Sequence, residues 1–161
     1  MNQKTLSILL KAVIIGTALC AAFVYCVLVP DLGHSLAYSG DGEFAHLYVP
    51  WLIVISLTAL PVAAAFVLAW LIARNIGRGN SFCRENAKYL AVISLLAGLD
   101  AAYFFIASIA LMMATGVGHP GVLIMVLLVC FAGAAICVAA AALSHYARKA
   151  ADLQQQSELT I

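Results

Sequence analysis

The sequence predicts an all-α integral membrane protein, a four-helix transmembrane bundle with both termini cytoplasmic. Hydrophobic residues make up 65% of the 161 residues and charged residues 9%, whereas soluble domains have about 45–50% and about 25%. The mean hydropathy is +1.07. Because a soluble globule of this composition could not cover its apolar surface, the chain is expected to sit in a bilayer. Its length corresponds to one domain, residues 1–161.

Four apolar runs are each long enough to cross a bilayer, which takes about 20 residues. The first is too long for the apolar part of a secretory signal, so we interpret it as a retained span. Between the first two spans we expect a loop from Pro30 to Val49, with Pro50 in the first turn of the second helix. Pro61 is expected to kink that helix. The predicted spans are residues 6–29, 51–73, 89–114 and 120–143.

The basic residues predict the orientation. Seven of them lie at the N-terminus, in a central loop at residues 74–88, or in a C-terminal tail at residues 144–161, and Lys11 lies about one turn inside the first span. The other two loops contain no Lys or Arg. By the positive-inside rule, the termini and the central loop are cytoplasmic. The eight basic residues are Lys4, Lys11, Arg74, Arg78, Arg84, Lys88, Arg148 and Lys149.

The central loop and the end of the tail contain the most distinctive polar residues. We expect Gly77 and Gly79 to end the second helix, and Asn80 or Ser81 to cap the third. One interpretation is a well-made turn with inside-positive charge. The other is a docking surface for a cytoplasmic partner or a lipid headgroup. The candidate docking residues are Ser81, Phe82, Arg84, Glu85, Asn86, Leu159, Thr160 and Ile161.

Asp100 is the sharpest single candidate, because it interrupts the third span about 16 Å from its start. A carboxylate at that depth is costly and suggests a functional site. It could instead form an interhelical hydrogen bond with Thr17, Thr58 or a backbone carbonyl. The only basic residue on a span that could reach toward it is Lys11.

Other residue groups have less specific interpretations. Small residues recur at four-residue spacing on the first and fourth helices, which predicts close packing within the bundle or, for the fourth helix, homodimerisation. Histidines and acids gather in the outer loops, but their spacing matches no zinc site, so we predict no metal and no cofactor. The cysteines form no disulfide or metal framework. The small residues are Ala12, Gly16, Cys20, Gly133 and Ala139–Ala142; the outer groups are His34, His46, His119, Asp31, Asp41 and Glu43.

The segment Gly79–Leu90 and the ending Ser157–Ile161 resemble signatures of the DUF-2975 (YoaS-like) family of small four-span bacterial membrane proteins. Two positions depart from the family pattern: Cys83 replaces a small hydroxyl residue, and Glu158 replaces Asp. The resemblance implies no catalytic residues and no cofactor. It also implies a possible partner, because members are often encoded beside a small helix-turn-helix regulator.

Two functions remain open from the sequence. The first is a non-enzymatic regulatory or interaction protein of the bacterial inner membrane, acting through the cytoplasmic loop and tail, with no direct nucleic acid binding and a possible homo-oligomer. The alternative is a small proton-coupled transporter that uses Asp100. An enzyme is not expected, because the spans contain no nucleophile–base pair, no HExxH and no paired carboxylates.

Overall fold

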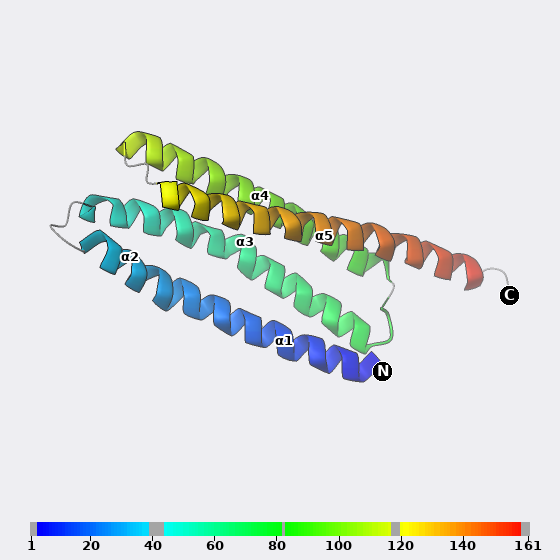
Figure 1. Ribbon diagram of the computed structural model, residues 1–161. Coiled ribbons are helices and arrows are strands. Elements are labelled where there is room, and N and C mark those ends of the chain that lie inside the picture. Colours follow the sequence, from blue (N-terminus) through cyan, green and yellow to red (C-terminus); the bar gives the residue numbers. More distant parts are fainter. Residues whose placement is uncertain (1–2, 39–43, 82, 117–119, 159–161) are drawn as a thin grey trace.

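The computed structural model describes residues 3–38, 44–81, 83–116 and 120–158. Its elements are α1 (Gln3–Phe23), η1 (Val24–Leu28), α2 (Val29–Tyr38), α3 (Ala45–Gly77), α4 (Arg84–Thr115) and α5 (Pro120–Glu158). Because α1, η1 and α2 run on as one continuous rod, the architecture is four long helices lying roughly side by side (Figure 1). The all-α four-helix prediction is confirmed.

The first helix continues well past its predicted end. The expected loop from Pro30 to Val49 is wrong, because α2 spans Val29–Tyr38 and α3 already begins at Ala45. The π-helical segment η1 lies directly before Pro30, and Val29 N–H bonds to Val24 O across five residues. A proline lacks an N–H and normally disrupts a helix. The wider π turn accommodates that missing bond, so the helix passes the proline instead of ending there.

Helix α3 also begins earlier than expected. Pro50 was predicted in its first turn, but it lies five residues after the first helical residue, Ala45. Phe44 is the N-cap, and its carbonyl accepts a bond from Leu47 N–H. Pro61 lies inside the same helix, as predicted. The connection between α2 and α3 is therefore much shorter than the sequence suggested.

The connection between α3 and α4 is a tight turn. Gly79 has a φ of +88°, as predicted, whereas Gly77 is the last residue of α3 and has no positive φ. The predicted caps, Asn80 and Ser81, are wrong: the N-cap of α4 is Cys83, and no side chain caps it. Arg74 and Lys88, which were assigned to the loop, lie on the flanking helices.

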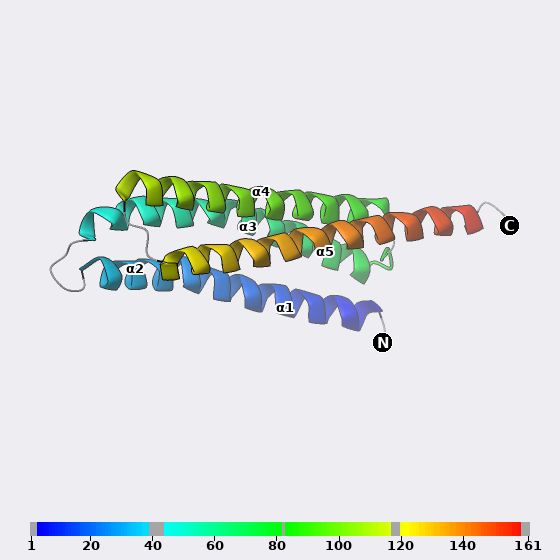
Figure 2. The ribbon, with the colours of Figure 1, turned by 45° about the horizontal axis from the view of Figure 1, so that its top comes forward.

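The end of α4 and the start of α5 follow the prediction, whereas α5 continues well past residue 143, where the fourth span was predicted to end. Helix α4 ends at Thr115 with Gly116 at a φ of +67°, and α5 starts at Pro120. Helix α5 continues through the tail to Glu158, so it projects past the ends of the other helices (Figure 2). Good helix formers after Leu143 explain why the helix does not stop where its apolar run ends.

The most extensive packing joins α4 to α5 along a seam of small residues. Ser94 Oγ donates to Cys137 O at 2.8 Å, and Ser144 Oγ donates to Ala87 O at 2.7 Å. Seven-residue spacing keeps one stripe of each helix against its partner, and small side chains let the two backbones approach closely. The seam consists of Ala87, Ser94, Gly98, Ala101 and Ser108 on α4, and of Val126, Cys130, Gly133, Cys137, Ala140, Ser144 and Ala151 on α5.

Glycine marks the closest approach in this seam. A Cβ placed on Gly133 would lie 2.9 Å from Ala101 Cβ, so no larger residue fits without a shift of the helices. The predicted packing role is therefore confirmed for Gly133. It is wrong for Gly16: that residue is exposed, as are Ala12 and Cys20, and a Cβ on Gly16 would meet nothing within 4 Å.

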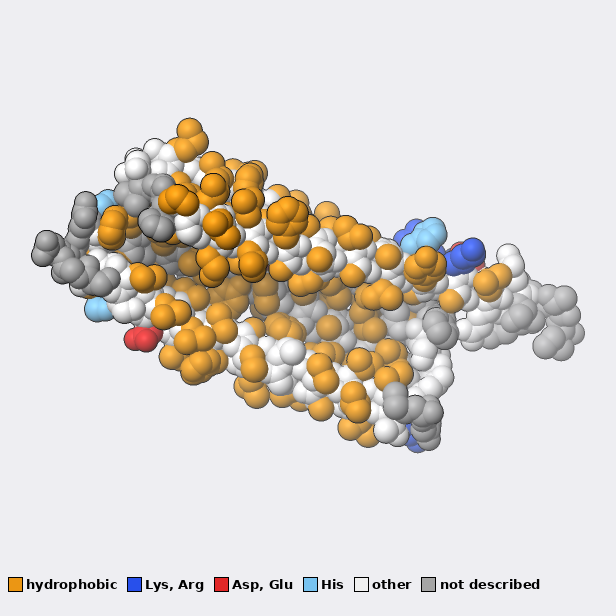
Figure 3. All heavy atoms as spheres, viewed as in Figure 1, with side chains coloured by type: hydrophobic (Ala, Val, Ile, Leu, Met, Phe, Trp, Pro, Cys, Tyr) orange, Lys and Arg blue, Asp and Glu red, His pale blue; other side chains and the backbone are white. Residues whose placement is uncertain are grey.

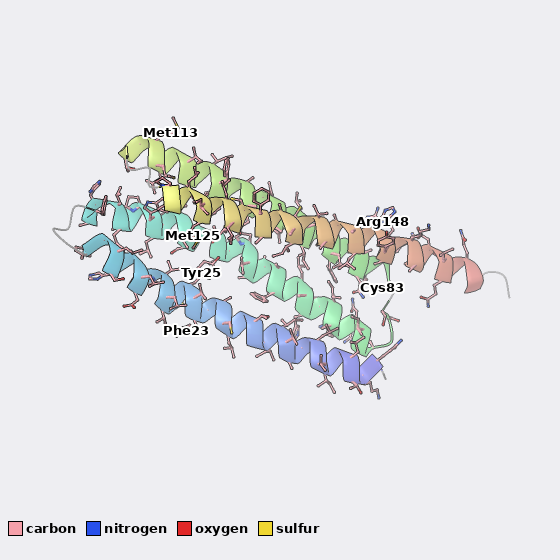
Figure 4. All side chains as sticks on the ribbon, in the orientation of Figure 1. Phe23, Tyr25, Cys83, Met113, Met125 and Arg148 are labelled. Atoms are coloured by element: carbon pink, nitrogen blue, oxygen red, sulfur yellow. The ribbon has the colours of Figure 1, made fainter. Side chains whose placement is uncertain are left out.

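The second pair is formed by the first helix and α3. At one end Ser7 Oγ donates to Ala73 O at 2.7 Å, and further along Tyr25 and Thr58 share a hydroxyl hydrogen bond of 2.8 Å. Figure 4 shows Tyr25 pointing toward α3, whereas Phe23 points away from the bundle. Helix α3 also packs on α4, which connects the two pairs into one bundle.

The outer surface of the bundle is apolar along most of its length. Figure 3 shows hydrophobic side chains covering the middle of the visible face, with charged groups gathered toward the ends. Within the described ranges, four helices are long and apolar enough to cross a membrane: 3–38, 45–77, 84–115 and 120–156. A surface of this kind is matched by lipid rather than water, so the protein is a multi-pass membrane protein.

Candidate functional site

The candidate site lies where the start of α4 meets the projecting part of α5. Figure 4 shows Arg148 of α5 and Cys83, just before α4, at the same end of the bundle. A hollow of about 330 Å³ opens between the two helices. We call its four lining residues, Arg84, Lys88, Arg148 and Asp152, the basic cluster.

One ion pair connects the central loop to the tail through this cluster. Arg84 Nε and Nη2 both donate to Asp152 Oδ1, at 3.1 Å and 2.9 Å. The two side chains are 65% and 46% exposed. An exposed pair of this kind contributes only about 0.2–1 kcal/mol to stability. The pair therefore orients the tail on the loop more than it stabilises the fold.

The tail helix is held to α4 on its other side by burial. Ala151 is buried, and Ser144 bonds to the carbonyl of Ala87 one turn inside the seam. The seven-residue pattern of small residues thus continues from the apolar span into the polar tail. As a result, the start of α4 and the tail helix lie against each other rather than as two independent segments.

Asn86 holds the turn between α3 and α4 together. Its Nδ2 donates to Asn80 O at 3.2 Å and to Ser81 O at 3.1 Å, and its Oδ1 accepts from Asn75 Nδ2 at 2.9 Å. The residue is 2% exposed. A buried amide with partners on both sides has no free group for a ligand. Asn86 thus fixes the conformation of the turn by its hydrogen bonds and is not an accessible docking residue.

The other predicted docking residues fall into two groups. Arg84 and Glu85 are exposed at the start of α4, and Ser81 is half-buried in the turn. Phe82, Leu159, Thr160 and Ile161 lie outside the described residues. The structure therefore places Arg84 beside α5 and adds Lys88, Arg148 and Asp152 to it.

Asp100 lies midway along α4, away from this end. Its Oδ1 is buried and has no hydrogen-bond partner among the described residues. The predicted bonds to Thr17 and Thr58 are not formed. Thr17 bonds to carbonyls of its own helix, and Thr58 bonds to Tyr25 and to Ile55 O.

Lys11 does not reach toward Asp100: its Nζ lies 5.5 Å from the ring centroid of Trp70 on α3, which is a cation–π distance. Ser108 is fully buried on α4, and its Oγ also has no partner in the described part of the chain. Helix α4 therefore carries two orphaned polar atoms.

At the opposite end of the bundle, His34 lies in an aromatic group. Its ring centroid is 4.5 Å from that of Tyr38 and 6.0 Å from that of Tyr48. Among the residues with described positions, no three His, Cys, Asp or Glu side chains come together as a metal site would require. Asp41, Glu43 and His119 fall outside those positions.

Comparison with known proteins assigns the family. The model of the family described as a protein of unknown function (DUF2975) matches residues 37–161. The chain belongs to this family. It is also 27% identical over 169 aligned positions to the uncharacterized membrane protein YoaS of Bacillus subtilis (strain 168), and the match covers 99% of each chain. No solved structure matches it.

The match covers the part of the chain that builds the candidate site. Both α4 and α5, and the turn before α4, lie within residues 37–161. Sequence reasoning had located the loop but missed its connection to the tail. The signal that could have found it is the run of small residues Cys137, Ser144 and Ala151, which continues the seam beyond the last apolar turn.

Proposed function

We propose that this DUF2975 protein is a non-enzymatic regulatory or interaction protein of the bacterial inner membrane. It holds a cytoplasmic partner at the membrane surface through the central loop and the tail. The observation that carries the proposal is the Arg84–Asp152 pair, which combines these two segments into one exposed polar surface. A partner that touches both segments gains more contact area than either could offer alone.

The resemblance described above suggests the partner, a small helix-turn-helix transcription factor. In this arrangement the membrane protein does not contact nucleic acid itself. It controls the regulator by holding it at the membrane, away from its DNA, or by releasing it. The polar side chains of the α4–α5 seam support a structural role for the spans, since the hydroxyls of Ser94 and Ser144 donate hydrogen bonds to backbone carbonyls. Hydroxyls used in this way are not available as nucleophiles.

The proposal requires the loop to face the cytoplasm. In a variant that keeps Cys83 as its single cysteine, we expect a membrane-impermeant maleimide to label the protein only after the cells are opened. Adding Ser35→Cys, on exposed α2 at the opposite end, should allow labelling of intact cells. The physical reason is that Lys and Arg near the span ends oppose translocation. Labelling of Cys83 from outside would reverse the orientation and remove the proposed docking surface.

Partner binding itself is tested with purified components. Purified small helix-turn-helix regulators from the same bacterium are titrated against the intact chain, a chain that ends at Gln156, and an Arg84→Glu variant. Loss of a central anchor typically costs 2 kcal/mol or more, so we expect binding at least about tenfold weaker for both variants. Ser35→Ala, at the other end of the bundle, is the control. Equal affinity for all four proteins would rule out docking at this surface.

A second function, a small proton-coupled transporter, is favoured by the buried Oδ1 of Asp100. An intramembrane acid without a partner is costly and is often part of an ion pathway. Export assays on Asp100→Asn distinguish the two functions, with Asp152→Asn as the matched control outside the spans. Full activity of Asp100→Asn would exclude the transporter, whereas loss of activity in that variant alone would support it.

A further inference from the structure

The basic cluster has an excess of positive charge that the ion pair does not neutralise. Three cations, Arg84, Lys88 and Arg148, line the hollow with one acid, Asp152, so its formal charge is +2. Among the described residues, the ion pair in this hollow joins Arg84 to Asp152. The first turn of α4 adds the partial positive charge of a helix start. A hollow of this charge favours an anion with several acceptor oxygens.

The cluster lies at the edge of the apolar belt. Lys88 is followed directly by Tyr89 and Leu90, where the apolar part of α4 begins. On α5, Arg148 is five residues beyond the exposed Leu143, or about 7.5 Å along the helix axis. The exposed Tyr146 lies between them, and tyrosine is enriched at the membrane–water interface. The cluster is therefore at the depth of lipid headgroups.

A row of exposed apolar side chains, here called the track, runs along α4 from the cluster toward the apolar middle of the helix. Val92, Leu95 and Leu99 follow Lys88 at spacings of four, seven and eleven residues, which places all four on one helix face. The three apolar side chains are exposed. An acyl chain lying on this face would bring its headgroup to Lys88.

We propose that the basic cluster binds the headgroup phosphate of an anionic phospholipid, with an acyl chain along the track of Val92, Leu95 and Leu99. Lys88 and Arg148 contact the phosphate, and Arg84 is held beside them by Asp152. The depth of the cluster and the track below it favour a lipid over a soluble phosphate or an acidic protein segment. Basic pockets between transmembrane helices are known to accept such headgroups. This inference goes beyond the proposed function, because it holds whether or not a protein partner binds.

The test is native mass spectrometry of the full chain in detergent, titrated with phosphatidylglycerol or with phosphatidylcholine of the same acyl chains. We expect preferential binding of phosphatidylglycerol. Each basic residue near the surface is worth roughly a factor of five in affinity, so Lys88→Gln with Arg148→Gln should weaken binding roughly 30-fold. Asp152→Asn should strengthen binding several-fold, because it removes the acid found among the described lining residues and frees Arg84. A merely destabilising change would not strengthen binding.

The matched control is Arg74→Gln with Arg78→Gln, which removes the same charge from residues outside the hollow. This control should keep the affinity of the native chain. An equal loss in the control would show attraction by net charge alone and overturn the site. Displacement of the lipid by inorganic phosphate at comparable concentration would show a soluble-anion site instead. Unchanged lipid binding in the Lys88 and Arg148 variant, with loss of regulator binding, would assign the hollow to a protein partner.

Discussion

Gly133→Leu is expected to lower the free energy of unfolding by about 3 kcal/mol, the upper range for overpacking a tight interface. The Cβ alone would lie 2.9 Å from Ala101 Cβ, and the backbone of α4 is within 4 Å behind it. Because both positions belong to rigid helices, neither can yield without separating α4 from α5. The measurement is reversible unfolding in mixed micelles followed by circular dichroism.

Gly16→Leu is the matched control for this change. It adds the same side chain to the same residue type, but a Cβ at Gly16 meets nothing within 4 Å. We expect a change within about 0.5 kcal/mol, as for substitutions away from packed contacts. A compensating pair sharpens the result: Gly133→Ala should destabilise the bundle, and adding Ala101→Gly should restore most of the loss. Equal effects of leucine at both glycines would show that the α4–α5 seam is not the tight interface described above.

Asn86→Leu is expected to be comparably damaging, with a loss of about 3 kcal/mol. The substitution leaves Asn75 Nδ2 and the carbonyls of Asn80 and Ser81 without their partner. Each buried polar group that loses its partner costs about 1–3 kcal/mol. Partial access of water to the turn limits the total. The readouts are the unfolding free energy and hydrogen exchange of the amides in residues 78–85.

Two further variants separate the hydrogen bonds from side-chain size at this position. Asn86→Asp keeps the size and the acceptor for Asn75 but places an oxygen against the two carbonyls, so it should be at least as damaging as Asn86→Leu. Glu85→Gln changes the exposed neighbour and should have almost no effect. If exchange in the turn were the same in Asn86→Leu as in the native chain, the network would not be what holds the turn.

Particular residues show how far local patterns could be interpreted. Proline illustrates the failure: Pro30 and Pro50 are strong local signals for helix boundaries, yet both lie inside helices. The deciding element at Pro30 is the π turn η1, which depends on bonds five residues apart and on the fit of α2 against Tyr48. The break between the third and fourth predicted spans illustrates the success: α4 ends at Thr115, Gly116 has a positive φ, and α5 starts at Pro120.

The candidate site also combines features that the sequence predicts with features that only tertiary contacts decide. Its basic residues in the loop were evident from charge alone, but Asp152 and Arg148 reach them only because α5 continues as a helix along α4. Likewise, Gly16 and Gly133 both lie among small residues in the sequence, and only the neighbours of each glycine in space distinguish the packed one from the exposed one.

By itself, the sequence determined that this is a four-helix membrane protein, because the length and apolarity of a span are properties of a continuous stretch of chain. It also determined which polar residues are unusual. Only the tertiary structure decided which faces of those helices meet, that Asn86 is internal, and that loop and tail share one surface. The reason is physical: in lipid, apolarity does not distinguish a buried helix face from an exposed one, so close packing and individual hydrogen bonds between distant residues make that choice.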